Sequence, residues 1–233
     1  MEKDGSPPSV LVIIAALNEE EGIGATLEEL RMVLEDPRYL VVDGNSADRT
    51  AKIAEEMGAE VLFQERSGKG DAITQAIRVF NSHVKYVVFI DADFTYPARC
   101  VPEMIRILEE NPEVGMVTGN RFNGYFKLRA MKRPFFLGNR FLAWAQLLLN
   151  GVNLVDPLTG LRVVRWRILK NWEPKSKGFD IEAEMNHRVE RQGYKTVEIP
   201  ISYRDRLGQK KLKLRDGFSI LRRIISESIC QFV

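Results

Sequence analysis

The chain has 233 residues with 34 Lys or Arg against 32 Asp or Glu, and a formal net charge of +2. Hydrophobic residues make up 45% of it, which is enough for a sizeable core and excludes a disordered chain. Two cysteines exclude a disulfide framework. No apolar run approaches the ~18 residues of a membrane span, and the polar start lacks the core of a signal peptide. These features predict a cytosolic protein, free or peripheral on a membrane.

Short apolar runs alternate with amphipathic stretches through the first 120 residues. Strands are predicted at 10–15, 39–42, 61–63, 86–90 and 114–117. Helices are predicted at 19–35, 46–57, 70–80 and 101–110. Strands that alternate with helices of this length predict βαβ units and a mainly parallel sheet flanked by helices. The fold class is therefore α/β.

Beyond residue 121 this alternation loosens. Helices are predicted at 137–149 and 178–191, a short edge strand at 197–200 and an amphipathic helix at 218–233. We therefore predict one domain over residues 1–215. Residues 216–233 form a C-terminal amphipathic helix that either lies on a bilayer or packs against the domain.

The balanced total charge conceals an uneven distribution. Residues 17–60 hold twelve acids and four bases, whereas 114–155 hold six bases and no acid. Residues 203–223 add eight bases against two acids. Such basic stretches attract nucleic acid, anionic lipid headgroups or phosphorylated substrates. Aromatic residues interleave the first of them, which fits RNA and a membrane interface equally well.

Polar residues gather at the ends of three predicted strands. Ala16-Leu-Asn-Glu19 follows the first strand, Asp43-Gly-Asn-Ser-Ala-Asp48 the second and Asp91-Ala-Asp93 the fourth. Ligands bind at the carboxyl ends of the strands in an open parallel sheet. A single acid there often only caps the next helix. Three such strand ends in one sheet favour a binding site.

Asp91-Ala-Asp93 is the most informative of these motifs. Two carboxylates so spaced after a strand can share Mg²⁺ or Mn²⁺, which prefer oxygen ligands completed by substrate phosphates. No Gly-x-Gly-x-x-Gly follows the first strand, and Ser67-Gly-Lys-Gly70 does not match a P-loop. We therefore expect carboxylates and metal to hold a nucleotide in place of a glycine-rich cradle.

The motifs carry a family resemblance when they are taken in order. They are Ala16-Leu-Asn-Glu-Glu20, Val41-Val-Asp-Gly-Asn-Ser-Ala-Asp-Arg-Thr50, Gly68-Lys-Gly70, Asp91-Ala-Asp-Phe-Thr-Tyr-Pro97, Asp156-Pro-Leu-Thr-Gly-Leu-Arg162, Gly178-Phe-Asp-Ile-Glu182 and Glu198-Ile-Pro-Ile201. Over residues 9–215 the chain resembles family 2 glycosyltransferases, and among them dolichol-phosphate mannose synthases and their prenyl-phosphate glucosyltransferase relatives.

The resemblance implies a Rossmann-like GT-A fold, a nucleotide-sugar donor, a divalent metal (Mg²⁺ or Mn²⁺) and inversion at the anomeric carbon. The implied nucleotide-binding residues are Ala16, Asn18, Glu19, Asp43, Asn45, Lys69, Asp91 and Asp93. The implied metal site comprises Asp91, Asp93 and Thr95, with Asp93 as the direct ligand. Thr95 stands where many mannose synthases carry Gln, a departure that bears on donor identity.

A prenyl monophosphate is an acceptor that needs no general base, because it is largely ionised at pH 7. The enzyme must instead compensate the charge of two anionic substrates. The candidates for phosphate contacts are Arg121, Arg140, Arg162, Arg204 and Lys211. The candidate catalytic set is Asp91, Asp93, Arg121, Arg162 and Asp180, in which Asp180 is paired with Glu182 as a base or a substrate-orienting group. The stretch 204–215 is expected to close over the phosphates.

The resulting hypothesis is metal-dependent transfer of a hexose, first of all mannose from GDP-mannose, to dolichyl or polyprenyl phosphate at the cytoplasmic membrane face. A UDP-glucose or UDP-N-acetylglucosamine donor is the nearest alternative. A hydroxyl acceptor is another, although Val164-Arg-Trp166 lacks the Gln of a Gln-x-x-Arg-Trp motif. An RNA-binding protein is the alternative outside enzymes. No RNA-binding module is present in the sequence, so we expect no nucleic-acid partner.

Overall fold

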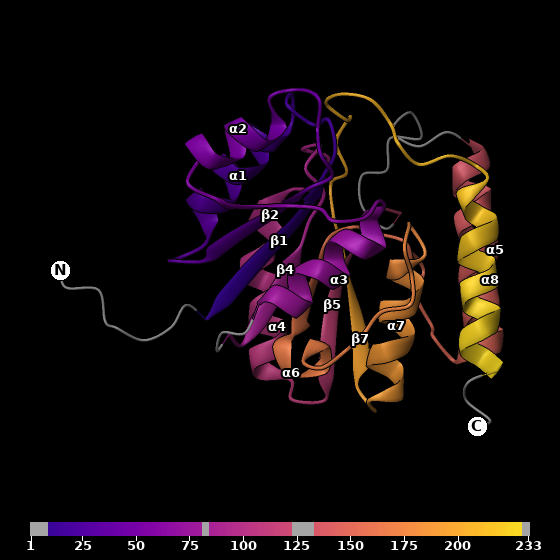
Figure 1. Cartoon of the computed structure of the whole chain (residues 1–233). Helices are drawn as coiled ribbons and strands as arrows, with labels where there is room; N and C mark the ends of the chain where they lie inside the picture. Colours follow the sequence, from indigo (N-terminus) through magenta and orange to yellow (C-terminus); the bar gives the residue numbers. More distant parts are fainter. Residues whose placement is uncertain (1–8, 81–83, 123–132, 230–233) are drawn as a thin grey trace.

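The computed structural model describes residues 9–80, 84–122 and 133–229 (Figure 1). The strands are β1 (Val10–Ala16), β2 (Arg38–Asp43), β3 (Glu60–Phe63), β4 (Tyr86–Phe89), β5 (Val114–Asn120), β6 (Arg162–Arg165) and β7 (Lys195–Pro200). The α-helices are α1 (Ile23–Val33), α2 (Thr50–Glu56), α3 (Lys69–Val79), α4 (Val101–Glu110), α5 (Arg133–Asn150), α6 (Trp166–Leu169), α7 (Ile181–Arg191) and α8 (Asp216–Ile229). A 3₁₀ turn, Ala98–Cys100, precedes α4.

The strands form one sheet in the order β3-β2-β1-β4-β6-β5-β7. Its neighbours are parallel except at β6, which runs antiparallel to both β4 and β5. The predicted α/β class with a mainly parallel sheet is therefore confirmed. Strand β6 was not predicted, because four residues bounded by Arg162 and Arg165 carry little hydrophobic signal of their own. Pairing with β4 and β5 forms this strand, although its own residues give little hydrophobic signal.

Alternate residues of each central strand face opposite layers of helices. In β1, Val10, Val12 and Ile14 pack in the cluster that includes side chains of α1, α2 and α4. Leu11 and Ile13 pack in the other cluster, with α3, α6 and α7. A strand covered on both faces reads as a continuous apolar run. Strand β1 is therefore buried on both faces, as predicted. Packing on both faces holds the carboxyl end of the strand in place.

Helices α5 and α8 lie side by side at one end of the molecule, beside α7 (Figure 1). A small core joins them, with Leu142 and Ala145 from α5 against Ile220 and Ile224 from α8. The C-terminal helix therefore packs against the domain through one face. Within the described ranges, no helix is both long and apolar enough to cross a bilayer. Three of the six bases counted in residues 114–155, namely Lys127, Arg129 and Lys132, lie outside the described residues.

Candidate active site

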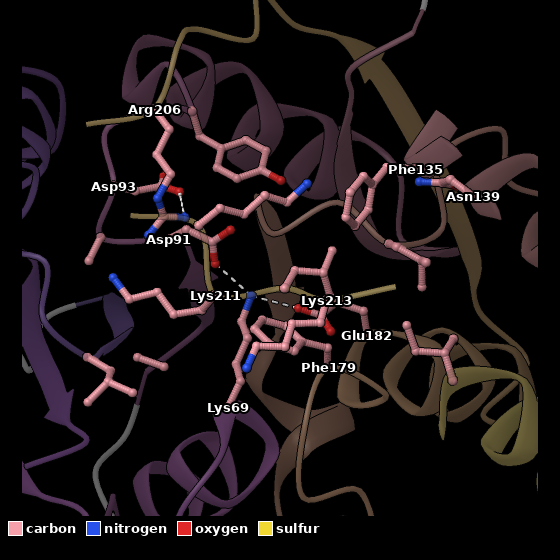
Figure 2. A pocket seen from close by; sticks show the side chains of 18 of the residues that line it. Lys69, Asp91, Asp93, Phe135, Asn139, Phe179, Glu182, Arg206, Lys211 and Lys213 are labelled. Atoms are coloured by element: carbon pink, nitrogen blue, oxygen red, sulfur yellow. Dashed lines mark hydrogen bonds and ion pairs between the residues drawn. The ribbon is translucent and has the colours of Figure 1, made fainter. Parts of the chain in front are cut away.

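The ends of neighbouring parallel strands bring the predicted carboxylates to one edge of the sheet. Strands β1 and β4 are adjacent; Glu19 follows the first of them, and Asp91 and Asp93 follow the second. The three side chains line a cavity of about 370 Å³ (Figure 2). Ala16 and Lys69 line the same cavity. The arrangement is that of a ligand site at the carboxyl edge of an α/β sheet.

Lys69, the first residue of α3, holds two of the carboxylates of the cavity. Its Nζ lies 2.6 Å from Oδ1 of Asp91 and 2.7 Å from Oε1 of Glu182 (Figure 2). Burial alone would lower the pKa of Lys69, but the two carboxylates outweigh it and raise that pKa above its usual range. Burial would likewise raise the pKa of Asp91, and the Lys69 ammonium lowers it instead. Lys69 and Asp91 are therefore both charged at neutral pH.

Asp93 has a different environment, although it lies only two residues from Asp91. Its Oδ1 accepts hydrogen bonds from the backbone N of Thr95 at 3.1 Å and from its hydroxyl at 2.6 Å. Its Oδ2 accepts one from Nη1 of Arg206 at 2.5 Å. Burial, and then the charge of Asp91, raise the pKa of Asp93. An added cation would therefore favour the charged form of Asp93.

Bases from the stretch that follows β7 reach these carboxylates from the opposite side. We call residues 204–215 the basic segment. Arg206 and Lys211 both donate to Oε1 of Glu19, the lysine at 2.9 Å. Two backbone hydrogen bonds fasten the segment to the residues after β4: Arg204 N to Thr95 O, 2.9 Å, and Leu207 N to Asp93 O, 3.2 Å. The basic segment therefore already lies across the carboxylate end of the cavity.

Two further arginines line the cavity with their guanidinium groups held by acids. Nε and Nη2 of Arg121 each donate to the buried Asp156 carboxylate at 2.7 Å. Burial would lower the pKa of Arg121, and Asp156 raises it well above its usual value. Arg204 forms two hydrogen bonds to Glu29, at 2.9 and 2.5 Å, and lies 4.2 Å from the centroid of the Phe94 ring. Both arginines are preorganised, as fixed charges must be to act on a phosphate.

Arg162 does not line the cavity, and its expected contact with phosphate stays a prediction that the geometry does not favour. The side chain is 1% exposed. It donates to the backbone carbonyls of Thr159, Pro157 and Glu182 and to Oδ1 of Asn186. Because its donors are occupied by these acceptors inside the protein, the residue fastens the loop before β6 to α7. Its role is structural.

Asp180 does not line the cavity either, and its predicted role stays a prediction. It precedes α7 and lies beside Arg223 of α8, with Oδ2 3.5 Å from Nε. Glu182, two residues on, faces the cavity instead. Residues i and i+2 of a helix point in different directions, so only one of the two acids could line the site. The predicted base or substrate-orienting role of Asp180 has no geometric support.

Thr95 is buried and donates its hydroxyl proton to Asp93, and it does not line the cavity. In this structure Thr95 orients Asp93, and its place among the metal ligands stays a prediction that the geometry does not favour. Asp43 is also fully buried, where it accepts hydrogen bonds from the N and Oγ of Ser46. Asn45 donates to the carbonyl of Gln64. These two residues shape the turn after β2 and lie outside the cavity lining.

The remaining predicted residues lie at the rim or outside the site. The backbone carbonyl of Asn18 accepts a hydrogen bond from Nζ of Lys211 at 2.7 Å, but its side chain does not line the cavity. Arg140 is exposed on α5, and its neighbour Asn139 lines the cavity in its place. The expectation that Arg140 contacts phosphate stays a prediction that the geometry does not favour.

Sequence reasoning missed Arg206, which lines the cavity, and it named Glu182 only as the partner of Asp180. Arg206 lies in the predicted basic segment, two positions after Arg204, where an extended chain places both side chains on one side. Glu182 belongs to the quoted Gly178–Glu182 motif. Sequence patterns marked both regions but did not indicate which member of each would face inward. Further cations of the segment that line the cavity are Lys210 and Lys213.

Asp91 and Asp93 are suited to hold a divalent cation together with a substrate. Their donors are hard oxygens, as Mg²⁺ and Mn²⁺ require, and such ions are commonly bound by one or two carboxylates plus phosphates. The neighbouring Oε2 of Glu19 is buried with no hydrogen-bond partner. Across the described part of the chain, no three acidic, His or Cys side chains gather as a metal site. The residues fit a metal that arrives with a diphosphate.

The opposite end of the cavity is apolar and lies between α5, α7 and α8. Its lining comes from side chains far apart in the sequence: Phe135, Leu142, Leu158, Phe179, Leu214 and Ile220. Figure 2 shows Phe135 and Asn139 across the cavity from Asp93 and Arg206. One space therefore joins a charged end to an apolar end.

Comparison with known proteins places this geometry in a family. The model of "Glycosyl transferase family 2" matches residues 11–165. A dolichyl-phosphate hexose transferase of Haloferax volcanii is 32% identical over 86% of this chain and 85% of its own length. Glycosyltransferase AglJ of the same organism is also 32% identical, over 85% of this chain, which spans only 64% of that relative.

Solved structures show the same fold at lower identity. Glucosyl-3-phosphoglycerate synthase from Mycobacterium tuberculosis, crystallised with uridine diphosphate, superposes with a TM-score of 0.74. The match covers 96% of this chain and 80% of that protein at 22% identity. At this identity the likeness establishes the fold alone.

Proposed function

Because the chain belongs to glycosyltransferase family 2 and is thus a hexosyltransferase, we propose that it transfers a hexose from a nucleotide sugar to a polyprenyl phosphate. The single observation that carries the proposal is the composition of its cavity. One continuous space joins strand-end carboxylates, a set of cations and an apolar end. The carboxylates suit a nucleotide sugar with a divalent ion, and the cations suit two phosphorylated substrates. The apolar end suits a prenyl chain.

The balance of charge favours two anionic substrates. Four carboxylates line the cavity: Glu19, Asp91, Asp93 and Glu182. Seven cationic side chains line it as well: Lys69, Arg121, Arg204, Arg206, Lys210, Lys211 and Lys213. Opposite charge in a partly closed cavity concentrates an anionic ligand and fixes its position. Two of the seven, Arg121 and Arg204, are paired with acids outside the lining, and the whole set is placed to bind a diphosphate and a monophosphate.

A phosphate acceptor also agrees with the state of the carboxylates. Glu182 lies 2.7 Å from Lys69, and Asp91 lies 2.6 Å from the same ammonium. Asp93 and Glu19 are both bonded to Arg206. A hydroxyl acceptor would require one carboxylate free to take its proton, whereas a prenyl phosphate is already a nucleophile. Because Lys69 holds both Asp91 and Glu182, neither of these acids is free to take that proton, which supports the phosphate over the hydroxyl acceptor.

The residues of the site divide the remaining tasks. Asp93 and Asp91 would hold the divalent ion, which supplies charge neutralisation of the donor diphosphate when bound. Arg121, oriented by Asp156, is placed to hold the acceptor phosphate. Arg206 and Lys211 change partners from carboxylates to phosphates as substrates enter. Together these cations would allow the donor diphosphate and the acceptor phosphate to approach each other in spite of their like charges.

GDP-mannose is the donor that we propose first, because the order of motifs resembles that of dolichol-phosphate mannose synthases. UDP-glucose is the main alternative, since Thr95 replaces the Gln that many mannose synthases carry. The structure shows Thr95 supporting Asp93, a role in which a threonine hydroxyl serves any diphosphate donor. Donor identity is therefore decided by experiment and not by this residue.

A membrane surface is the proposed place of action. The outward faces of α5 and α8 expose large apolar side chains, among them Phe141, Trp144, Leu148, Phe218 and Ile229. Exposed apolar stripes beside basic residues are typical of helices that rest in the headgroup region. This position would present the apolar end of the cavity to a lipid-borne acceptor on the cytoplasmic face.

A nucleotide-sugar panel tests the proposal. Purified protein is incubated with Mn²⁺, a water-soluble prenyl phosphate and GDP-mannose, UDP-glucose or UDP-N-acetylglucosamine, and the lipid-linked product is measured. We expect one donor to dominate, and we expect the matching prenyl alcohol to give no product. Equal turnover of the alcohol would replace the phosphate acceptor by a hydroxyl acceptor. RNA binding in a parallel filter assay without any transfer would overturn the enzyme assignment.

A further inference from the structure

Two glycines, Gly138 in α5 and Gly217 in α8, differ from the other glycines that the structure describes. Both line the cavity. A Cβ added at either would meet no protein atom within 4 Å. Each of the other described glycines either has a left-handed backbone or has protein atoms within that distance. At Gly160, for example, a Cβ would lie 2.4 Å from Oδ2 of Asp91.

The protein itself gives no reason for these two glycines. Gly138 lies inside α5 and Gly217 is the second residue of α8, and neither has a left-handed backbone. Inside a helix, glycine is less favourable than any other residue except proline. Neither is required by a turn, by a left-handed backbone or by an approaching chain. The space beside them is therefore kept open at a cost to helix stability, and a ligand is what would use it.

The surroundings of the two glycines define the chemistry of that ligand. Gly138 lies one helical turn from Phe135 and from Leu142, which line the same cavity. Gly217 lies three residues before Ile220, which also lines it. Lys210 and Lys213 of the basic segment border the same space. An apolar chain with an anionic head fits this combination, and a nucleobase or a free sugar does not use the apolar walls.

We propose that Gly138 and Gly217 form a notch between α5 and α8 that admits the first isoprene units of the acceptor, so that they determine acceptor specificity. The inference rests on the proposed transfer to a prenyl phosphate and adds to it the residues that select the tail. The phosphate of the acceptor then points along the cavity toward Arg121 and the carboxylate end. The donor lies at that far end and does not touch the notch.

Leucine substitutions test the notch. Gly138→Leu and Gly217→Leu fill it, whereas Ser219→Leu adds the same side chain to an exposed position of α8 that does not line the cavity. We expect the first two to raise the KM for farnesyl phosphate at least ~30-fold, as loss of buried isoprenoid surface requires. The KM for a methyl phosphate acceptor, and the affinity for GDP or UDP with Mn²⁺, should not change. Ser219→Leu should match the wild type in every assay.

Alanine substitutions separate the notch from a folding defect. Gly138→Ala and Gly217→Ala should leave the melting temperature unchanged or raise it, because alanine favours the helix. The leucine variants should also melt no lower than the wild type, since a Cβ at either position meets no protein atom within 4 Å and the rest of the side chain would extend into the cavity. Unfolding of a leucine variant would contradict the open space beside the glycine. In that case the alanine variants still report on farnesyl phosphate binding, with a smaller expected rise in KM.

Direct binding of farnesyl phosphate, measured by calorimetry, distinguishes failure of the inference from failure of the proposed function. Wild-type turnover with unchanged KM in both leucine variants would overturn the notch and leave the function standing. Loss of GDP or UDP affinity in those variants would assign the space to the donor, which would also overturn the proposal that the notch binds the acceptor. Binding by the wild type alone, without turnover, would support the notch and refute the transfer. A wild type that neither binds nor uses the acceptor would overturn both.

Discussion

The cavity has two walls of different origin. The strand wall comprises Glu19, Asp91 and Asp93, each of which lies within four residues of the end of a buried strand. The helix wall comprises α5, the basic segment and α8, of which the two helices share a small core with α7. Ion pairs of Arg206 and Lys211 with the strand wall connect the two. The strand wall is thus fixed by the sheet, and the helix wall is partly fixed by the strand wall.

This difference determines which wall responds to ligands. The carboxylates of the strand wall keep their positions whatever the cavity holds, because the main chain that carries them belongs to the sheet. The cations of the basic segment now occupy places that a metal and phosphates would compete for. Ligand binding therefore changes the partners of the helix wall and leaves the strand wall in place. Substitutions in the two walls should have effects of different kinds.

The largest effect is expected in the strand wall, at Asp93. Asp93→Asn keeps the shape and the hydrogen bonds from Thr95 but removes the charge of the proposed metal ligand. We expect turnover to fall about 10³-fold, at the upper end of what one fixed electrostatic group contributes. Binding of Mn²⁺ with GDP or UDP, followed by electron paramagnetic resonance, should weaken in parallel. The melting temperature should not fall, because burial already opposes the charged form of this carboxyl.

Asp205→Asn is the matched control, because Asp205 is exposed and does not line the cavity. It should retain wild-type turnover and metal binding. Full activity of Asp93→Asn at saturating Mn²⁺, with a normal melting temperature, would contradict the metal role. The strand wall would then not carry the metal site through Asp93.

A smaller effect with an unusual sign is expected in the helix wall, at Arg206. Arg206→Gln frees Asp93 from its present cation and leaves Glu19 paired with Lys211 alone. Without nucleotide the protein should therefore bind Mn²⁺ about tenfold more tightly, as loss of one competing charged hydrogen bond predicts. With substrates present the same guanidinium is needed for phosphate, and turnover should fall about 10²-fold. Calorimetry with Mn²⁺ alone, beside steady-state kinetics, measures both.

Arg215→Gln removes the same charge from an exposed part of the segment that does not line the cavity. Arg215→Gln should change neither the affinity for Mn²⁺ alone nor the turnover. If Arg206→Gln binds free Mn²⁺ no better than Arg215→Gln does, Arg206 is not competing for the carboxylates. The helix wall would then have to be regarded as independent of the strand wall.

The two walls also differ in how far the sequence predicts them. The strand wall follows from local patterns, because an apolar run sets the strand and the next few residues must lie at its carboxyl end. Glu19, Asp91 and Asp93 were predicted in this way and lie together. The sheet was predicted as well, apart from β6, whose place between β4 and β5 depends on neighbours distant in the chain.

The helix wall could be predicted only as a region. The basic segment was recognised by its composition, yet the direction of each side chain depends on what the segment packs against. Arg206 was therefore missed. Arg162 and Asp180 were assigned to the site because they belong to motifs. The structure buries the first among carbonyls and turns the second toward Arg223. Composition indicates which charges are near a site, and tertiary packing decides which of them enter it.

The smallest expected effect is a pH dependence of the helix wall, carried by His187. This side chain lies between α7 and α8, and both ring nitrogens are buried without a hydrogen-bond partner. Burial, and then the charge of Arg191, lower its pKa below the usual 6.5, and Glu184 opposes this in part. Glu227 of α8 lies 3.5 Å from Nε2, and burial raises the pKa of that carboxyl.

The sign of the effect follows from proton binding. Below pH 6.5 the unfolded chain takes up a proton on this histidine more readily than the folded one, so the stability that neutral His187 contributes is present above that pH. It is lost as the pH falls toward the lower pKa of the folded state, with a slope of at most ~1.4 kcal/mol per pH unit. Glu227 has a raised pKa and acts in the opposite direction. Only a difference between variants therefore isolates the histidine.

His187→Phe keeps a ring at the contact and removes the titrating group. Between pH 7 and pH 5.5 we expect the wild type to lose up to about 1 kcal/mol more unfolding free energy than the variant, as measured by urea denaturation. Hydrogen exchange at pH 5.5 should accelerate in α8 and remain slow in β1, because only the helix wall rests on this contact. Equal slopes for the two proteins would exclude His187 as the source. Acceleration in β1 as large as in α8 would show that the two walls open together, which contradicts a strand wall fixed by the sheet alone.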